Sequence, residues 1–178
     1  KMMTPIKEAS NLLNRDEVLA KRRRYWPIRR TQDIILSLLA LLVLWPLMLV
    51  LALIIWIDSP KASPIFAQDR VGRDGKEFRF YKFRSMIPNA EEKLDGLLAD
   101  NEMEGPAFKM KDDPRITRMG KFLRKSSLDE LPQLINVFLG DMSLVGPRPH
   151  MLKHTEEYSA LIDNYMVRHL VKPGITGW

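Results

Sequence analysis

The longest hydrophobic stretch of the chain runs from Ile34 to Ile57 and is interrupted only by Ser37 and Pro46. A straight helix over this stretch would be about 36 Å long, enough to cross the roughly 30 Å hydrocarbon core of a bilayer. Proline lacks a backbone donor and clashes with the preceding helical turn. The pattern therefore predicts a membrane segment over residues 31–57 that is broken at Pro46 into two helices, each too short to span.

Basic residues on both sides of this segment indicate how it meets the membrane. Tyr25 and Trp26 lie among the basic residues that precede it, namely Lys21, Arg22, Arg23, Arg24, Arg29 and Arg30. The basic residues that follow it are Lys61, Arg70, Arg73 and Lys76. Because Lys and Arg beside aromatic residues mark a cytoplasmic membrane edge, positive charge on both flanks favours a re-entrant segment that enters and leaves by the cytoplasmic face.

The pattern after the membrane segment predicts an α+β domain over residues 58–178 with a small sheet. Two β-prone runs, Pro64–Val71 and Lys76–Phe83, flank an Asp-Gly pair, which is typical of a β-hairpin. Apolar stripes predict amphipathic helices over 88–101, 128–139 and 158–166, with a basic segment over 113–125. Gly140 is expected to end the second of these helices.

The formal net charge of +6 comes from a short part of the chain. Residues 1–30 hold nine Lys/Arg and three Asp/Glu, whereas the remainder holds nineteen of each. A nucleic-acid-binding domain would carry its basic stripe on the folded part, so this distribution argues against a nucleic-acid partner. It predicts a basic N-terminal arm at the membrane interface, and the lack of cysteine excludes disulfides and thiolate metal sites.

Asp129 and Glu130 are the first candidates for chemistry, and their spacing supports two interpretations. Ser127 and Glu130 could form a capping box at a helix start, or Asp129 could be the cap, which would place Pro132 in the first turn where proline is tolerated. Alternatively, the two adjacent carboxylates hold Mg²⁺ against a phosphate, and the aspartate acts as a nucleophile that forms an acyl-phosphate. Spacing alone leaves both interpretations open.

Four basic residues are candidates for binding a phosphate. Arg148 lies between two prolines that keep the backbone extended, and its guanidinium suits bidentate phosphate binding. Lys82 and Arg84 share one face of the second predicted strand if that strand continues through Arg84. Arg124 could join them from the basic segment. Each of these residues alone could equally be a solvated surface charge.

The order of several motifs resembles a known family. The matching stretches, over about residues 28–178, are the proline-interrupted membrane segment, Asp69-Arg70-Val71-Gly72, Tyr81-Lys82-Phe83-Arg84-Ser85-Met86, Ser127-Leu128-Asp129-Glu130-Leu131-Pro132-Gln133-Leu134, Gly140-Asp141-Met142-Ser143-Leu144-Val145-Gly146-Pro147-Arg148-Pro149 and Lys172-Pro173-Gly174-Ile175-Thr176-Gly177. With these motifs the chain resembles the bacterial sugar transferase family of monotopic polyprenyl-phosphate phosphoglycosyl transferases. Such enzymes act at the cytoplasmic face of the bacterial inner membrane.

The resemblance implies a two-step reaction. Asp129, with Mg²⁺ held by Asp129 and Glu130, would attack the β-phosphate of a UDP-sugar and release UMP. Undecaprenyl phosphate would then take the phospho-sugar from Asp129, which begins the assembly of a surface glycan such as an exopolysaccharide or lipopolysaccharide. Arg148 would hold a substrate phosphate. Since large members of the family are often dimers, the resemblance leaves both a monomer and a homodimer open.

The chain departs from the family pattern in two places. Trp45 stands before the proline of the membrane segment, where the family usually has serine. Family members also continue beyond the Lys172–Gly177 motif, so a further part of the catalytic domain is expected after Trp178. Two other functions fit the residues alone: a membrane-associated glycosyltransferase that releases UDP, and a non-catalytic membrane-anchored module that binds phosphate or lipid.

Overall fold

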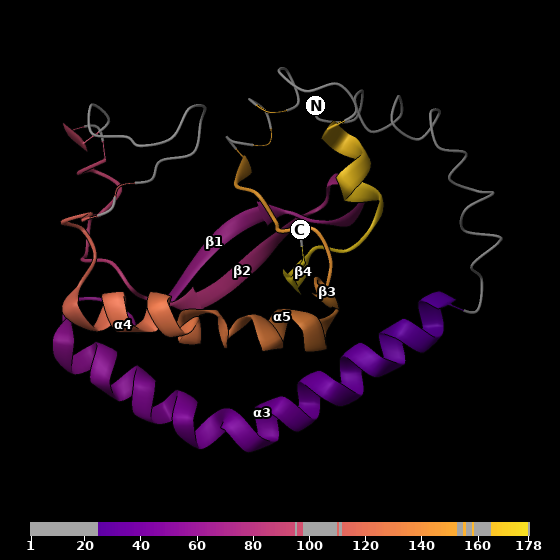
Figure 1. Cartoon of the computed structure of the whole chain (residues 1–178), viewed down its shortest axis with the longest axis horizontal. Coiled ribbons are helices and arrows are strands. Elements are labelled where there is room, and N and C mark those ends of the chain that lie inside the picture. The colour runs from indigo at the N-terminus through magenta and orange to yellow at the C-terminus, as the bar shows by residue number, and fades with distance from the viewer. Residues whose placement is uncertain are drawn as a thin grey trace. The chain divides into compact units, whose positions relative to one another are not determined.

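The computed structural model describes residues 25–94, 96–97, 110, 112–152, 155, 158 and 165–177. The chain divides into two compact units, and Figure 1 labels its helices and strands. The first unit consists of residues 1–43, 68–80 and 133–178, and the second of residues 44–67 and 81–132. Both contain helices and short strands, so the predicted α+β class is confirmed.

A single helix, α3 (Tyr25–Asp58), covers the whole hydrophobic stretch and extends through both units. Pro46 lies inside it. The secondary structure is one helix through Pro46 and shows no separation into two helices, and the re-entrant turn at this proline stays a prediction. With 34 residues α3 is about 51 Å long, which exceeds the hydrocarbon core of a bilayer.

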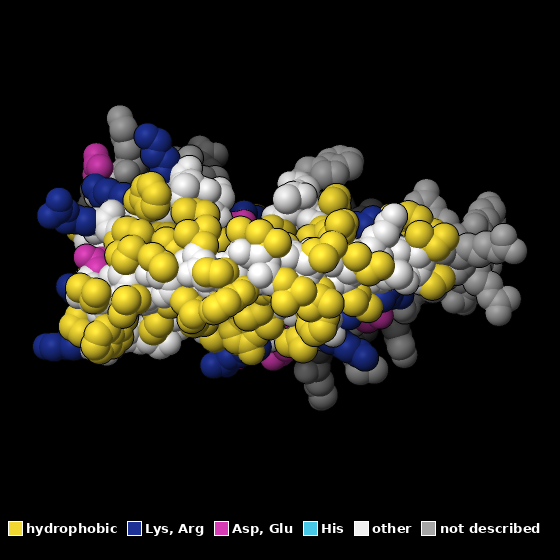
Figure 2. All heavy atoms as spheres, turned by 90° about the horizontal axis from the view of Figure 1, so that it is seen from below, with side chains coloured by type: hydrophobic (Ala, Val, Ile, Leu, Met, Phe, Trp, Pro, Cys, Tyr) yellow, Lys and Arg dark blue, Asp and Glu magenta, His cyan; other side chains and the backbone are white. Residues whose placement is uncertain are grey.

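Most of α3 is uncovered by the rest of the chain. Only 11% of its most apolar window is buried, and by length and composition this helix could cross a membrane. Figure 2 shows hydrophobic side chains along α3, and Val43, Leu49 and Ile57 are each more than 60% exposed. A long apolar surface of this kind indicates association with a membrane.

The predicted hairpin is confirmed. Strands β1 (Ile65–Val71) and β2 (Glu77–Phe83) pair with each other and are joined by the short 3₁₀ helix η1 (Arg73–Gly75). Asp74 and Gly75 both have positive φ angles, 59° and 72°. Asp and Gly tolerate this conformation better than most residues, which explains why the pair marks the turn.

The second unit is built around an apolar core to which α3 contributes. Leu51 and Ile55 of α3 pack with Phe83 and with Leu123 of α4 (Arg118–Ser126). The helix α4 begins at Thr117, whose side chain accepts a hydrogen bond from the Gly120 N–H at 2.9 Å. Leu128 and Leu131, which precede and follow Asp129 and Glu130 in the sequence, pack against the same core.

The first unit contains α5 (Gln133–Leu139) and a second small sheet. Strands β3 (Ser143–Val145) and β4 (Gly174–Thr176) pair in parallel, and the 3₁₀ helix η4 (Tyr165–Leu170) precedes β4. A Cβ at Gly174 would lie 2.0 Å from the Gly146 nitrogen. The motifs that contain Gly146 and Gly174 therefore meet so closely that only glycine fits at position 174. Val137 and Met142 form the core with Phe80.

Two predicted helices differ from the structure, and a third is largely untested. Residues 88–94 form turns with i to i+3 hydrogen bonds, and Asn89 has a φ of 59°, so a helix does not begin there. The predicted helix over 128–139 consists of the 3₁₀ turn η3 (Leu128–Glu130) followed by α5, which ends at Gly140 as expected. The predicted helix over 158–166 falls largely outside the described residues.

Candidate functional site

Asp129 and Glu130 lie in η3, directly after a sharp turn that ends α4. Ser127 forms this turn in the left-handed conformation (φ 56°, ψ 17°), and its backbone N–H donates to the Arg124 and Leu123 carbonyl oxygens. Its side chain makes no capping hydrogen bond. The capping-box interpretation is therefore wrong: Ser127 ends one helix and does not cap the next. The turn projects the two carboxylates from the end of α4.

The environment of Asp129 disfavours its charged form. Burial of the half-exposed carboxyl raises the pKa of Asp129, and the neighbouring charge of Glu130 raises it further. Lys82 and Arg124 act in the opposite direction and lower this pKa. Two acids and two cations thus meet at one place in the second unit. A carboxylate that is partly desolvated but balanced by cations suits nucleophilic attack on phosphorus.

Arg124 is held in place by a buried serine. Its Nε donates to the Ser85 Oγ at 2.9 Å, and Ser85 is 2% exposed. A Cβ at Gly120 would lie 1.9 Å from the Ser85 carbonyl oxygen, so the absence of a side chain lets α4 pack directly on this backbone. Desolvation lowers the pKa of Arg124, whereas Asp129 raises it. Such an arginine still carries its charge at neutral pH.

A buried ion pair of Asp113 and Arg115, which the sequence pattern does not predict, acts electrostatically on Arg124: Asp113 raises the pKa of Arg124 and Arg115 lowers it. Asp113 accepts four hydrogen bonds from Arg115, one of them from Nη2 at 2.7 Å. Both side chains are less than 10% exposed. The hydrogen bonds from Arg115 are the main cause that lowers the pKa of Asp113. In the sequence, the only local sign of this ion pair is the spacing of Asp113 and Arg115, two residues apart.

Lys82 and Arg84 share one face of the hairpin. Both lie over the ring of Phe66, at 5.3 Å for the Lys82 Nζ and 5.8 Å for the Arg84 Cζ from its centroid. The charge of Lys82 also lowers the pKa of Asp129. Arg84 instead donates from Nε to the Ser63 carbonyl oxygen at 2.7 Å. Of the two, Lys82 is therefore the stronger candidate for contact with a phosphate.

Arg148 belongs to the first unit, where it follows β3 in an exposed segment without regular secondary structure. The adjacent Pro149 is buried, and its carbonyl oxygen accepts a hydrogen bond from the Arg70 Nη1 at 2.7 Å. The Arg148 carbonyl oxygen accepts one from the Arg168 Nη2, also at 2.7 Å. The backbone on both sides of the guanidinium is thus fixed by hydrogen bonds.

The acidic pair is also the best candidate for binding a divalent cation. In the part of the chain that the structure describes, no group of three or more His, Cys, Asp or Glu side chains could hold a metal. Magnesium, however, is commonly held by one or two carboxylates together with substrate phosphates. The repulsion from Glu130 that raises the pKa of Asp129 would be relieved by a cation, so Asp129 and Glu130 fit this ion.

Comparison with known proteins identifies the family of the chain. The family model for bacterial sugar transferases matches residues 24–178. The chain is 47% identical over 151 residues to a UDP-glucose:undecaprenyl-phosphate glucose-1-phosphate transferase of Escherichia coli strain K12, covering 85% of this chain and 30% of that protein. It is 46% identical over 170 residues to an undecaprenyl-phosphate galactose phosphotransferase of Salmonella typhimurium, covering 93% of this chain and 34% of that protein.

A third relative differs in the sugar that its name gives. The chain is 43% identical over 151 residues to a UDP-N-acetylgalactosamine-undecaprenyl-phosphate N-acetylgalactosaminephosphotransferase of Aeromonas hydrophila, covering 85% of this chain and 33% of that protein. The chain spans about a third of the length of these relatives. The match to the family model, together with these identities, shows that the chain belongs to the bacterial sugar transferase family.

Proposed function

We propose that the chain transfers a sugar-1-phosphate from a UDP-sugar to undecaprenyl phosphate and releases UMP. The observation that carries the proposal is the partly buried pair Asp129 and Glu130, where the charges of Lys82 and Arg124 act on the Asp129 carboxyl and lower its pKa. Three relatives are named as undecaprenyl-phosphate sugar phosphotransferases. A phosphate-transfer site needs a nucleophile and fixed positive charge, and this pair with its two cations offers both.

In the first step an Asp129 carboxylate oxygen attacks the β-phosphorus of the UDP-sugar. The bond from this phosphorus to the bridging oxygen breaks, and UMP leaves with that oxygen. Lys82 and Arg124 lie where they would stabilise the negative charge that develops on the phosphoryl oxygens. The product of the step is a phospho-sugar bound covalently to Asp129.

In the second step a phosphate oxygen of undecaprenyl phosphate attacks the same phosphorus. The bond to the Asp129 oxygen breaks, the carboxylate is restored, and an undecaprenyl-diphospho-sugar leaves. The lipid substrate must reach the site from the membrane. Leu128 and Leu131, on either side of the acidic pair in the sequence, pack against the core cluster that includes Leu51 and Ile55 of α3.

Mg²⁺ is the cation that we assign to Asp129 and Glu130. When bound, it would neutralise charge on the phosphates and on the two carboxylates. Arg148 binds a substrate phosphate in this scheme, and Arg84 contributes positive charge beside Lys82.

The membrane topology is part of the proposal. We infer that α3 enters and leaves by the cytoplasmic face of the inner membrane, since basic residues flank both of its ends. Pro46, near the middle of the apolar stretch, is the position at which such a helix would turn back. Reporters placed before Tyr25 and after Gly177 should both lie on the cytoplasmic side. Reporters on opposite sides of the membrane would contradict the re-entrant topology.

Nucleotide release tests the reaction. Purified protein in detergent receives Mg²⁺ and a panel of UDP-sugars, with and without undecaprenyl phosphate. We expect UMP release that depends on the lipid and falls about a thousandfold or more in Asp129→Asn. Asp112→Asn is the matched control, because Asp112 is an exposed aspartate of the same unit. It should retain activity.

The same assay separates the alternatives. Release of UDP would indicate transfer of the sugar without its phosphate, as in a glycosyltransferase. Binding of UDP-sugar or lipid without any nucleotide release, equal in Asp129→Asn and the unsubstituted chain, would indicate a binding module. Retention of UMP release in Asp129→Asn would contradict the covalent role of this residue.

A further inference from the structure

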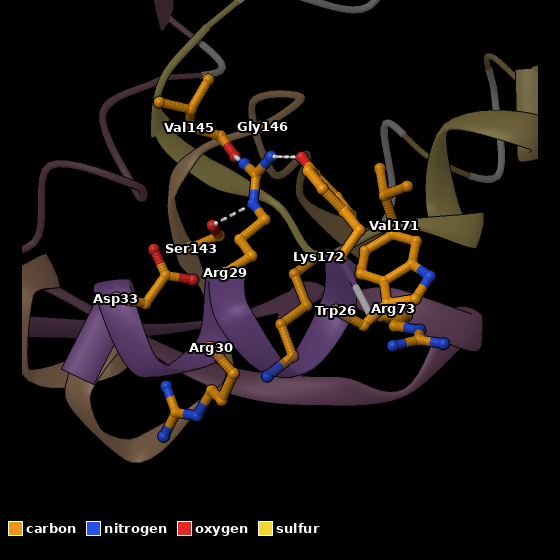
Figure 3. Close-up of a pocket in the computed structure, with 11 residues that line it drawn as sticks. Trp26, Arg29, Arg30, Asp33, Arg73, Ser143, Val145, Gly146, Val171 and Lys172 are labelled. Carbon is orange, nitrogen blue, oxygen red and sulfur yellow. Dashed lines mark hydrogen bonds between the residues drawn. The ribbon is translucent and has the colours of Figure 1, made fainter. Parts of the chain in front are cut away.

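A pocket of the first unit lies at the N-terminal end of α3. It has a volume of about 460 Å³. Its walls come from the first turns of α3, from η1, from β3 and from the loop before β4 (Figure 3). A cavity of this size can take a small organic ligand or a lipid headgroup.

Four cations line this pocket, and two of them, Arg29 and Arg30, are held by hydrogen bonds within the fold. Arg29 donates from Nε to the Ser143 Oγ at 3.1 Å, and its other nitrogens donate to the Val145 carbonyl oxygen and the Tyr25 hydroxyl. Figure 3 shows its guanidinium turned toward β3, while the charged ends of Arg30, Arg73 and Lys172 are turned the other way. Arg30 donates to the Val137 and Phe138 carbonyl oxygens, at 2.6 and 2.7 Å. Arg73 and Lys172 are therefore the cations available to a ligand.

Arg30, Arg73 and Lys172 lie close enough to disfavour one another. Burial, and then the charges of Arg30 and Arg73, lower the pKa of Lys172, although Asp33 and Asp141 act against this. A Cβ at Gly140 would lie 3.0 Å from the Arg30 Nη2 and 3.5 Å from the Lys172 Nζ, so both reach the same glycine. Within the described residues, neither Arg30 nor Lys172 forms an ion pair with a carboxylate.

Two buried donors in the pocket point to a missing acceptor. The Trp26 Nε1 and the Arg73 Nε are both buried and have no hydrogen-bond partner, although the Arg73 Nε lies 3.5 Å from the Asp74 Oδ2. The Arg73 guanidinium lies 5.3 Å from the Trp26 ring centroid. Buried donors are normally satisfied, so an unpaired indole N–H beside a guanidinium indicates a site for an oxygen-rich anion.

We propose that this pocket binds the phosphate headgroup of an anionic membrane phospholipid through Trp26, Arg73 and Lys172. The pocket lies at the end of an apolar helix that has the length to enter a bilayer, where headgroup phosphates are concentrated. Tyr25 and Trp26 are aromatic residues of the kind that lie at the headgroup level of membranes. The bound headgroup holds the start of α3 at the membrane surface, which is a role separate from sugar transfer.

The binding experiment uses the full chain in a neutral detergent and short-chain lipids as probes. Dioctanoyl phosphatidylglycerol is titrated by calorimetry against dioctanoyl phosphatidylcholine and against inorganic phosphate. We expect phosphatidylglycerol to bind at least about tenfold more tightly than phosphatidylcholine, and more weakly as salt is added. Asp129→Asn should bind it unchanged, so failure of the proposed transferase reaction would not alter this result.

Substitutions locate the binding to the pocket. Arg73→Gln and Lys172→Gln should each weaken phosphatidylglycerol binding by about fivefold, whereas the charge-preserving Lys172→Arg should retain most of it. Trp26→Phe keeps the ring but removes the unpaired donor and should also weaken binding. The matched control is Arg79→Gln, because Arg79 is an exposed arginine of the same unit, ion-paired with Asp69 outside the pocket.

Three results would overturn the proposal. Equal binding of the two lipids would show that the headgroup charge is not recognised. An equal loss of binding in Arg79→Gln and Arg73→Gln would show that net charge, and not this pocket, attracts the lipid. Inorganic phosphate that binds as tightly as phosphatidylglycerol would show a site for a free anion. Circular dichroism of each variant checks that a loss of binding does not reflect unfolding.

Discussion

The two halves of α3 are held by different kinds of contact. In the first unit, polar side chains attach the helix: Asp33 accepts a hydrogen bond from the Leu144 N–H, and Arg30 donates to the Val137 and Phe138 carbonyl oxygens. In the second unit, Leu51 and Ile55 attach it through apolar packing alone. The polar contacts require defined directions, whereas apolar packing requires only a fitting volume.

This difference matters for a helix that enters a membrane. Apolar side chains are equally well solvated by lipid tails and by a protein core, so packing of the second half fixes its position weakly. Polar groups in an apolar environment must find their partners, so hydrogen bonds specify where the first half lies. We infer that the first unit sets the position of α3 and that the second unit couples it to the acidic site.

The largest loss of stability should come from a substitution in the apolar second half of α3. Leu51→Ala removes a side chain that is 4% exposed from the core of the second unit. We expect a loss of about 2–5 kcal/mol in the free energy of unfolding, measured by denaturant titration in detergent. Leu49→Ala is the control on the same helix, because Leu49 is 61% exposed. Equal losses in the two variants would contradict the packing of α3 in this core.

A smaller effect is expected from the polar half. Asp33→Ala leaves the Leu144 N–H without its acceptor and should cost about 1–3 kcal/mol in the same titration. Asp33→Asn keeps an acceptor oxygen and should cost less. Asp58→Ala is the control, because Asp58 is an exposed carboxylate at the other end of the helix. If Asp33→Ala and Asp58→Ala were alike, hydrogen bonding would not position the first half.

The smallest effect should be a gain in stability at the acidic site. Because the folded-state pKa of Asp129 is raised, its charged form opposes folding at neutral pH. Asp129→Asn should therefore unfold at a slightly higher temperature than the unsubstituted chain near pH 7. The difference should shrink as the pH falls through the raised pKa toward the ordinary value of 3.8.

Asp112→Asn serves as the control for this gain, since the Asp112 side chain is 83% exposed. A difference between Asp129→Asn and the unsubstituted chain that stayed constant with pH would contradict the assigned cause. The charged form of Asp129 lowers the stability of the fold at neutral pH. Such a shifted pKa is typical of residues whose environment serves catalysis.

The parts of the fold that the sequence predicts correctly have local signals. The Asp74-Gly75 pair fixes the hairpin, and Gly140 ends α5, because each supplies a backbone conformation that other residues adopt poorly. The parallel pairing of β3 and β4 has no such signal, since these are three-residue strands far apart in the chain. An apolar stripe predicts a helix from residue 88, but Asn89 has a positive φ and the chain forms turns there. The spacing of apolar residues does not reveal a left-handed backbone conformation at one position.

The candidate site shows the same division. The acidic pair is visible in the sequence, but the interpretation of Ser127 as a cap fails because its backbone is left-handed. Arg29 and Arg30 are interpreted from the sequence only as flanking charge, yet they bind backbone and side-chain oxygens of distant residues. The ion pair of Asp113 and Arg115 depends on burial, which the sequence does not record.

The most direct test of the account is a search for the phospho-sugar on Asp129. The chain is incubated with Mg²⁺ and a UDP-sugar in the absence of undecaprenyl phosphate, quenched rapidly, and digested for peptide mass spectrometry. The account predicts a peptide containing Asp129 that gains the mass of one sugar phosphate and loses it again when undecaprenyl phosphate is added before the quench. UMP release with both substrates present, but with no adduct on Asp129 at any time, would contradict the covalent mechanism.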